Sequence, residues 1–208
     1  MYQPPHFRED RPEIQHALMR AHPLALLVTF GAGGLTANPV PLLLHPEIGE
    51  RGVLRGHLAR ANPQWRSFDP AVDALAVFQG ADAYITPSWY ETKRETGKVV
   101  PTWNYAVVQV YGRLTVVEDA GWLSEQVRAL TERHEASRPA PWAVSDAPEE
   151  FTRAQLKGIV GIEIAISRVE AKWKVSQNRP AADRAGVAEG LSGEGGAARA
   201  MATLVAER

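Results

Sequence analysis

Two short aromatic segments in the middle of the chain could bind a flat ligand. The first, Y-I-T-P-S-W-Y, covers residues 84–90, and the second, V-P-T-W-N-Y, covers residues 100–105. Six of the sixteen aromatic residues lie between positions 84 and 111. Pro87 and Pro101 cannot donate a backbone hydrogen bond to a sheet, so the neighbouring rings should lie at strand ends or in rigid turns. Such rings suit a flat ligand, and they equally suit an interface between strands or subunits.

Two groups of polar residues could bind an anion. Arg60 and Asn62 follow a predicted strand and precede a predicted short helix, where backbone N–H groups and a guanidinium would favour a phosphate. The segment K-W-K-V-S-Q-N-R, residues 172–179, is a second basic and polar cluster at the end of another strand. A solvated turn arginine and an ordinary strand end are the simpler interpretations of these two groups.

Composition excludes several function classes. The chain has 208 residues, a net charge of -1 and no cysteine, so disulfides, thiol nucleophiles and Cys-based metal sites are excluded. The six histidines show no close metal-ligand spacing, and no Walker loop or G-x-S-x-G nucleophile motif is present. We therefore expect no metal. The absence of a dense Lys/Arg cluster argues against direct DNA binding. The N-terminus does not resemble a signal peptide and the apolar runs are too short to cross a membrane, so we expect a cytoplasmic protein.

The predicted elements form an antiparallel sheet with helices at its periphery. Periodicity predicts a first helix over residues 12–22 and a hairpin of strands 24–30 and 35–44 around the turn G-A-G-G. The remaining expected strands are 53–58, 74–79, 83–86, 102–117 and 159–169, with an interruption at Gly80 and a mobile charged loop at 91–98. Asp119 should begin a helix that ends near Glu135, and further helices are expected at 148–157, 180–191 and 197–206. A sheet of this kind tends to close into a barrel. The expected division is a domain over residues 1–191, followed by a flexible break and a C-terminal helix over residues 192–208.

Several long motifs resemble the PaiB family, described as FMN-binding negative transcriptional regulators. They are M-Y-Q-P-P-H-F at the start, H-L-A-R-A-N-P-Q-W at 57–65, the two aromatic segments, and S-Q-N-R at 176–179. The resemblance runs in order from residue 1 to about residue 191. It implies a mainly β (α+β) fold, a split β-barrel of the FMN-binding and pyridoxamine-phosphate-oxidase type, assembled as a homodimer with flavin at the subunit interface.

The resemblance also implies which residues bind FMN. The phosphate would be held after a central strand by His57, Arg60, Asn62 and Gln64. The flavin ring would be lined by Asn38, Pro39, Trp103, Asn104, Tyr105, Lys174 and Gln177.

Three functions remain open from the sequence. The first is a flavin-binding negative regulator of transcription that acts directly or through a partner. The second is an oxidoreductase in which FMN accepts hydride from NADH or NADPH and passes electrons to an unknown acceptor. The third is a dimeric binding module without flavin. No residue in the sequence commits the chain to a substrate, so the catalytic residues stay unknown.

Overall fold

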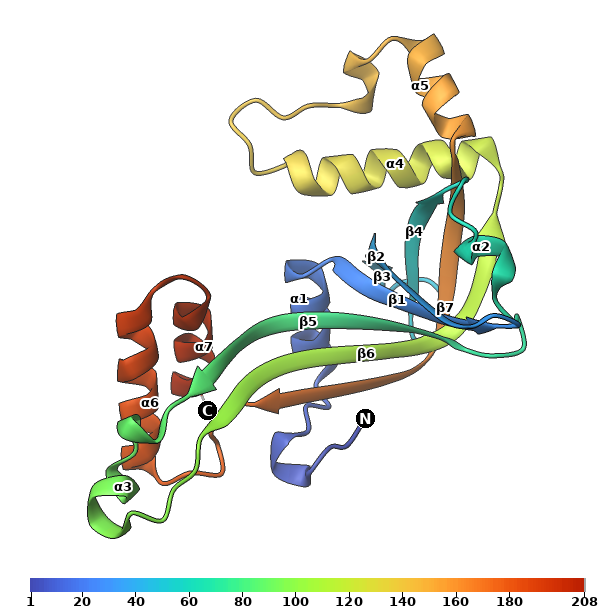
Figure 1. Ribbon diagram of the computed structural model, residues 1–208. Coiled ribbons are helices and arrows are strands. Elements are labelled where there is room, and N and C mark those ends of the chain that lie inside the picture. Colours follow the sequence, from blue (N-terminus) through green and yellow to red (C-terminus); the bar gives the residue numbers. More distant parts are fainter. Residues whose placement is uncertain (208) are drawn as a thin grey trace. The chain divides into compact units, whose positions relative to one another are not determined.

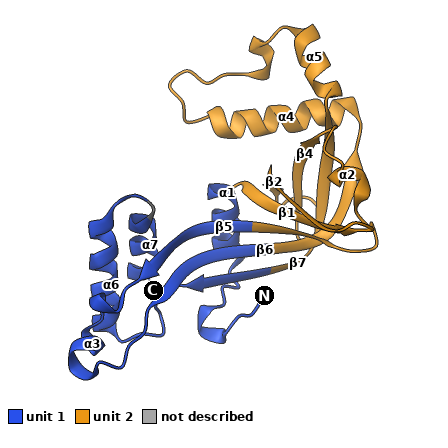
Figure 2. Cartoon of the chain, in the orientation of Figure 1, with its two compact units in different colours: residues 1–22, 78–109, 170–208 blue, residues 23–77, 110–169 orange. Residues whose placement is uncertain are grey.

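The computed structural model describes residues 1–207, which form a seven-stranded antiparallel sheet with helices around it (Figure 1). The strand order is β2-β1-β5-β6-β7-β4-β3. The chain divides into two compact units, shown in Figure 2. Unit 1 contains residues 1–22, 78–109 and those from 170 onward, and unit 2 contains residues 23–77 and 110–169. Each unit is therefore assembled from segments that are far apart in the sequence.

Unit 2 is a barrel that closes at a kink in one strand. Leu42 separates β2 from β3; β2 pairs with β1, whereas β3 pairs with β4. Because β2 and β3 are the two edges of the sheet and only one residue lies between them, the sheet closes on itself. Gly56 permits close packing at the kink, where a Cβ would lie 2.7 Å from the Leu42 side chain. These strands are β1 (Leu24–Gly31), β2 (Gly34–Pro41), β3 (Leu43–His45) and β4 (Val53–Ala59).

Three long strands contribute residues to both units: β5 (Ala74–Ile85), β6 (Thr102–Val117) and β7 (Ile159–Lys174). The predicted interruption at Gly80 is wrong, because β5 is continuous. A Cβ at Gly80 would lie 2.9 Å from the Leu18 side chain, so this glycine allows close packing instead of ending the strand. The alternation of buried residues changes phase between Gly80 and Ala83. The strand β7 is longer than predicted and includes Lys172 and Lys174.

The helices of unit 1 are α1 (Pro12–Ala21), α3 (Glu91–Thr96), α6 (Ala181–Glu194) and α7 (Gly196–Ala206). The predicted charged loop at 91–98 is largely helical. Thr92 donates from its backbone N and its Oγ1 to the two carboxylate oxygens of Asp183 on α6, both at 2.9 Å. Gly97 ends α3 in the left-handed conformation with φ 69°. Between α6 and α7 only Gly195 is non-helical, so the predicted break at 192–196 is shorter than expected.

The helices of unit 2 are α2 (Gln64–Ser67), α4 (Ala120–Glu135) and α5 (Glu149–Lys157). Asp119 begins α4 as predicted, since its Oδ1 accepts from the backbone N of Trp122 at 2.8 Å. Short 3-10 turns occupy Pro5–Phe7, Pro87–Trp89 and Val144–Asp146. Among residues 1–207, none of these helices combines the length and the apolar character that crossing a bilayer requires. Aliphatic side chains fill the barrel, and Leu27, Leu54, Ile162 and Ile164 have no exposed surface.

Candidate flavin site

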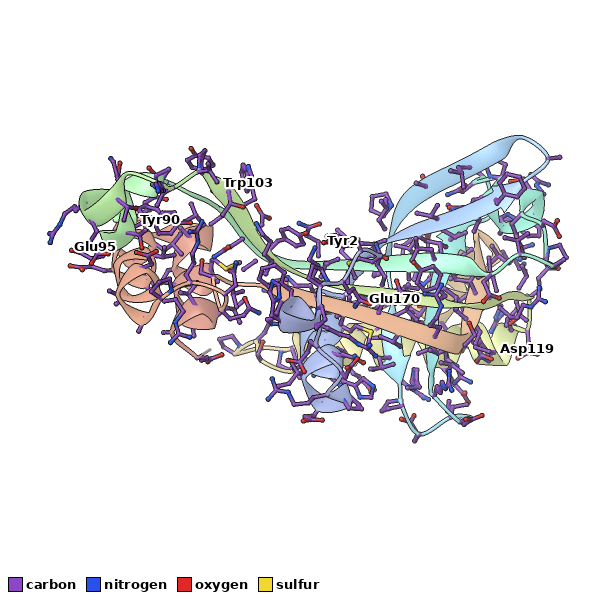
Figure 3. All side chains as sticks on the ribbon, turned by 90° about the horizontal axis from the view of Figure 1, so that it is seen from below. Tyr2, Tyr90, Glu95, Trp103, Asp119 and Glu170 are labelled. Atoms are coloured by element: carbon purple, nitrogen blue, oxygen red, sulfur yellow. The ribbon has the colours of Figure 1, made fainter. Side chains whose placement is uncertain are left out.

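One face of the sheet in unit 1 combines aromatic rings with lysines; we call it the aromatic-basic face. Trp103 on β6 and Tyr84 on β5 are 55% and 48% exposed, with ring centroids 6.0 Å apart in an edge-to-face contact. Figure 3 shows the Trp103 side chain standing clear of the ribbon near the start of β6. Tyr105 lies two residues further along β6 and therefore on the same face. The members of the aromatic-basic face are Tyr84, Trp103, Tyr105, Lys172 and Lys174.

Lys172 is a buried cation without a carboxylate partner. Its side chain is 6% exposed, and its Nζ lies 5.2 Å from the ring centroid of Tyr105 and 5.4 Å from that of Tyr2. No ion pair to Lys172 occurs within residues 1–207. The rings of Tyr105 and Tyr2 stabilise the ammonium through cation–π contacts. Among residues 1–207 the ammonium of Lys172 therefore has aromatic neighbours and no carboxylate counter-ion.

Lys174 lies close to two other positive charges, those of Lys172 and Arg179. Lys174 donates from Nζ to Thr102 Oγ1 and to the Trp103 carbonyl oxygen. Burial lowers the pKa of Lys174, and repulsion from Lys172 and Arg179 lowers it further. The Arg179 guanidinium lies 4.6 Å from the Tyr90 ring centroid. We call Lys172, Lys174 and Arg179 the cationic cluster.

A buried polar contact supports this cluster. Asn104, 1% exposed, donates from Nδ2 to Ser176 Oγ at 2.9 Å and so ties β6 to the turn after β7. Ser176 has φ 65°, a left-handed conformation that non-glycine residues rarely adopt and that is enriched at functional sites. Gln177 folds back on its own turn, where its Oε1 accepts from the Val175 backbone N at 2.8 Å. Asn104 and Gln177 therefore position the turn that carries Arg179.

In unit 2, Gln64 is the centre of a hydrogen-bonded plug that fastens α2 to the barrel. It is completely buried; its Nε2 donates to the Leu27 carbonyl at 3.1 Å and to Thr29 Oγ1 at 3.2 Å. Its Oε1 accepts from Asn38 Nδ2 at 2.8 Å, and its backbone N donates to Asn62 Oδ1 at 3.0 Å. The amide of Gln64 is thus occupied by protein partners. Three of the predicted site residues, Asn38, Asn62 and Gln64, meet in this plug.

Arg60 is also engaged by the protein. It donates from Nε to the Lys157 carbonyl at 3.1 Å and from Nη2 to the Ile159 carbonyl at 3.1 Å, and it forms an ion pair with Glu118. Its guanidinium lies 5.8 Å from the Trp65 ring centroid. These contacts fasten the turn after β4 to the beginning of β7. A phosphate at Arg60 would have to share or replace them.

His57 and Pro39 complete the predicted residues of unit 2. His57 faces the layer formed by α4 and α5, in a cavity that Val127, Trp142 and Phe151 also line. Burial lowers the pKa of His57, and its Nδ1 is buried without a hydrogen-bond partner among the described residues. Pro39 is exposed and pairs with Leu26 of β1.

The eleven predicted residues thus lie in two groups, one in each unit. Unit 1 contains Trp103, Asn104, Tyr105, Lys174 and Gln177; unit 2 contains Asn38, Pro39, His57, Arg60, Asn62 and Gln64. The FMN-binding set implied by the resemblance omits Lys172, Arg179 and Tyr84. All three nevertheless lie in segments that the sequence singled out, namely the basic segment 172–179 and the aromatic segment 84–90. Within residues 1–207, no three metal-binding side chains are arranged around a common point.

Comparisons with known proteins agree with this architecture. The model of the family described as "Putative FMN-binding domain" matches residues 1–168. An uncharacterised protein of Emericella nidulans is 36% identical over 96% of this chain and 94% of its own length. The protease synthase and sporulation protein PAI 2 of Bacillus subtilis is 33% identical over 100% of this chain and 98% of its own length.

A solved structure shows the same fold. The FAD and heme binding protein of Mycobacterium smegmatis superposes with a TM-score of 0.57 and 17% identity over 80% of this chain and 73% of that chain. The split β-barrel predicted from the sequence is confirmed. With a family match over most of its length and a full-length relative of this identity, the chain belongs to the PaiB-type family of FMN-binding domain proteins.

Proposed function

We propose that this chain binds FMN on the aromatic-basic face and serves as a PaiB-like negative regulator of transcription. The donor set fits the ligand. A phosphate monoester carries about -1.5 to -2 charge near neutral pH, and the cationic cluster supplies three positively charged side chains. Among residues 1–207, Lys172 has no carboxylate partner. The exposed rings of Trp103 and Tyr84 offer a surface for a flat three-ring system. The single observation that carries the proposal is the grouping of Lys172 and Arg179 around Lys174, whose Nζ is hydrogen-bonded to the carbonyl of the exposed Trp103.

We further propose that the chain forms a homodimer. The outer surface of the β1–β2 hairpin is apolar and exposed: Leu24 is 64%, Phe30 is 48% and Leu35 is 75% exposed. Leu24, Leu26 and Phe30 lie on one face of β1, and Phe30 pairs directly with Leu35, so these exposed side chains form a strip along the hairpin. Exposed apolar patches of this kind are typical of protein interfaces. A homodimer formed on this strip is our proposal for the assembly.

Family membership supports the regulatory role. The net charge of -1 offers little attraction for DNA, so we propose that the effect on transcription involves a protein partner or a short, local DNA contact. FMN would supply the redox chemistry, and the residues of this chain would bind and orient it.

The cofactor proposal is tested by titrating purified protein with FMN and following the quenching of flavin fluorescence. Lys172→Met should weaken binding by about 1.5–3 kcal/mol, which is roughly tenfold or more, because a charge-assisted contact is lost. Lys98→Met is the matched control, since Lys98 is exposed in the same unit. Equal affinities for the wild type and Lys172→Met would remove the cationic cluster from the site.

The regulatory proposal is tested separately by gel-shift titration against genomic fragments, with and without FMN and at near-physiological salt. Retardation of specific fragments supports direct repression, and its absence leaves only a role through a partner. Anaerobic mixing with NADH or NADPH in a stopped-flow instrument addresses the oxidoreductase alternative. Rapid bleaching of bound flavin would favour an enzyme over a regulator.

A further inference from the structure

The sheet of unit 1 has two outer edges, and the N-terminal segment of the chain covers one of them. In this unit the sheet consists of β5, β6 and β7, so β5 and β7 are its outer strands (Figure 2). Arg8 forms a bridge with Lys172 of β7. The Ala171 carbonyl accepts from the Glu9 backbone N at 3.1 Å and from Gln3 Nε2 at 2.7 Å. The outer edge of β7 is therefore paired within the chain.

The outer edge of β5 is open. Among residues 1–207, β1 is the neighbour of β5 on that side, and its pairing covers only residues 75–77 of β5. Outside the sheet, no described backbone hydrogen bond involves residues 78–85. The outward-pointing N–H and C=O groups of residues 78–85, here called the β5 edge, thus lack a partner from another strand. Such an edge is a template on which an extended peptide can add a further strand.

The strand β5 changes phase shortly after its pairing with β1 ends. Buried positions alternate up to Gly80 and resume at Ala83, one residue out of step. A shift of this kind is typical of a β-bulge, which bends a strand and ends its pairing. Beyond the shift, Asp82 and Tyr84 are exposed, whereas Ala83 and Ile85 are buried. Asp82 and Tyr84 therefore lie on one face of the β5 edge.

Asp82 gives the open edge a negative charge. It is exposed, and its carboxylate forms no ion pair or hydrogen bond within the described part of the chain. In a paired strand, the Cβ of the residue directly opposite would lie about 4.5–5.5 Å away, where an opposite charge is favourable and a like charge is unfavourable. The charge of Asp82 therefore favours a Lys or Arg at the opposite position.

Tyr84 determines the second side chain. Its ring is 48% exposed and lies two residues beyond Asp82, in edge-to-face contact with Trp103. An aromatic side chain opposite Tyr84 would cover this ring, and cross-strand aromatic pairs stabilise neighbouring strands. Antiparallel pairing is the more stable arrangement, and in it the peptide meets Tyr84 before Asp82. The matching peptide therefore has an aromatic residue followed, two positions later, by a basic one.

We infer that the β5 edge binds an extended segment of a protein partner as an additional antiparallel strand. The backbone of the segment pairs with the β5 edge, its aromatic residue lies against Tyr84, and its Lys or Arg lies against Asp82. This interaction surface goes beyond the proposed flavin site. Because Tyr84 also belongs to the aromatic-basic face, the tests below use the full-length chain without added FMN, so that their outcome does not depend on flavin binding.

Fluorescence anisotropy with labelled seven-residue peptides tests this inference. The peptide T-V-F-T-K-V-T should bind with a dissociation constant below about 100 μM. A peptide with Glu in place of Lys should bind at least threefold more weakly. Two further peptides carry N-methyl groups on the odd or on the even residues. One of these two should bind at least tenfold more weakly, because main-chain hydrogen bonds supply the affinity of an added strand.

Asp82→Lys reverses the charge of the edge without disturbing the core, because Asp82 is exposed. This variant should bind the lysine peptide at least threefold more weakly than the wild type and the glutamate peptide at least threefold more tightly. Glu95→Lys, at an exposed position of α3 in the same unit, is the matched control and should behave as the wild type does. Hydrogen–deuterium exchange at the β5 edge should become slower when the lysine peptide is bound.

The inference is overturned if the lysine peptide does not bind, if both N-methylated peptides bind as well as it does, or if Asp82→Lys leaves both affinities unchanged. Slow exchange at the β5 edge that depends on protein concentration without peptide would instead assign the edge to a second copy of the chain. Fast exchange there together with no peptide binding would mean that Asp82 only protects an exposed edge against aggregation.

Discussion

Polar side chains in the two units differ in whether other residues of the protein satisfy them. In unit 2, the polar atoms of Gln64 and three donors of Arg60 are taken up by protein partners. In unit 1, Lys172 has aromatic rings around it and no carboxylate partner among residues 1–207, and Trp103 on the same face of the sheet is exposed. A group whose hydrogen bonds are satisfied by the protein stabilises the fold, whereas a cation without a counter-ion can pair with an anionic ligand. The contrast separates residues that build the barrel from residues that are free to bind.

The largest expected effect is on the plug in unit 2. Gln64→Leu leaves the Leu27 carbonyl, Thr29 and Asn38 without their partner, and each buried unsatisfied group costs about 1–3 kcal/mol. We expect the free energy of unfolding to fall by about 3 kcal/mol or more, measured by urea denaturation. Gln155→Ala, at an exposed position, should change it by less than about 0.5 kcal/mol. A small effect of Gln64→Leu would contradict its assignment to the fold.

Arg60→Ala sharpens the comparison because the sequence assigns this residue to the phosphate and the structure gives it protein partners. Loss of its contacts to the Lys157 and Ile159 carbonyls should lower stability by about 1–3 kcal/mol. Arg66→Ala is the control: the Arg66 guanidinium lies 5.2 Å from the centroid of the same Trp65 ring, and its side chain makes no hydrogen bond among residues 1–207. A tenfold loss of FMN affinity with unchanged stability would instead assign Arg60 to FMN binding.

Trp103→Ala should weaken FMN binding and leave the stability of the fold nearly unchanged. The ring is 55% exposed, so we expect stability to change by less than about 0.5 kcal/mol. Loss of ring stacking should weaken FMN binding by about 0.5–1.5 kcal/mol, or roughly two- to twelvefold. Trp142→Ala, at a ring 49% exposed in unit 2, should leave FMN binding unchanged. If Trp103→Ala and Trp142→Ala bind FMN equally well, the exposed rings of unit 1 do not stack on FMN.

The smallest expected effect concerns His57. Burial lowers its pKa below the ordinary value of 6.5, so below that pH the unfolded chain binds a proton that the folded chain does not. Stability should therefore fall as the pH decreases from 6.5 through the lowered pKa, as followed by thermal denaturation at a series of pH values. His57→Phe should reduce this slope. An unchanged slope would assign the acid sensitivity to other groups.

Local signals in the sequence predicted much of the fold. The hairpin around G-A-G-G, the strand over 102–117 and the helix capped by Asp119 all depend on neighbouring residues. The helix α3 escaped prediction because it is held by Asp183, 91 residues further along the chain. The closure of the barrel at Leu42 is equally non-local.

For the candidate site, too, the sequence identified residues by local pattern but not the contacts that come from distant parts of the chain. The family resemblance selected Trp103, Tyr105 and Lys174, and the two-residue spacing of Trp103 and Tyr105 places both rings on one face of β6. Sequence could not reveal that Gln64 is enclosed by Thr29 and Asn38 or that Arg60 meets Glu118, since those partners come from other elements. Residue type identifies a group that can bind, and only the fold shows whether it is already bound.

The length of β7 has a consequence for where this protein can be cut. The matched family segment ends at residue 168, six residues before the end of that strand. A fragment trimmed to the matched segment would keep most of the barrel and its family signature while discarding every member of the cationic cluster. Boundaries drawn from family resemblance alone would, for this chain, yield a recognisable protein that has lost the residues proposed to bind the flavin phosphate.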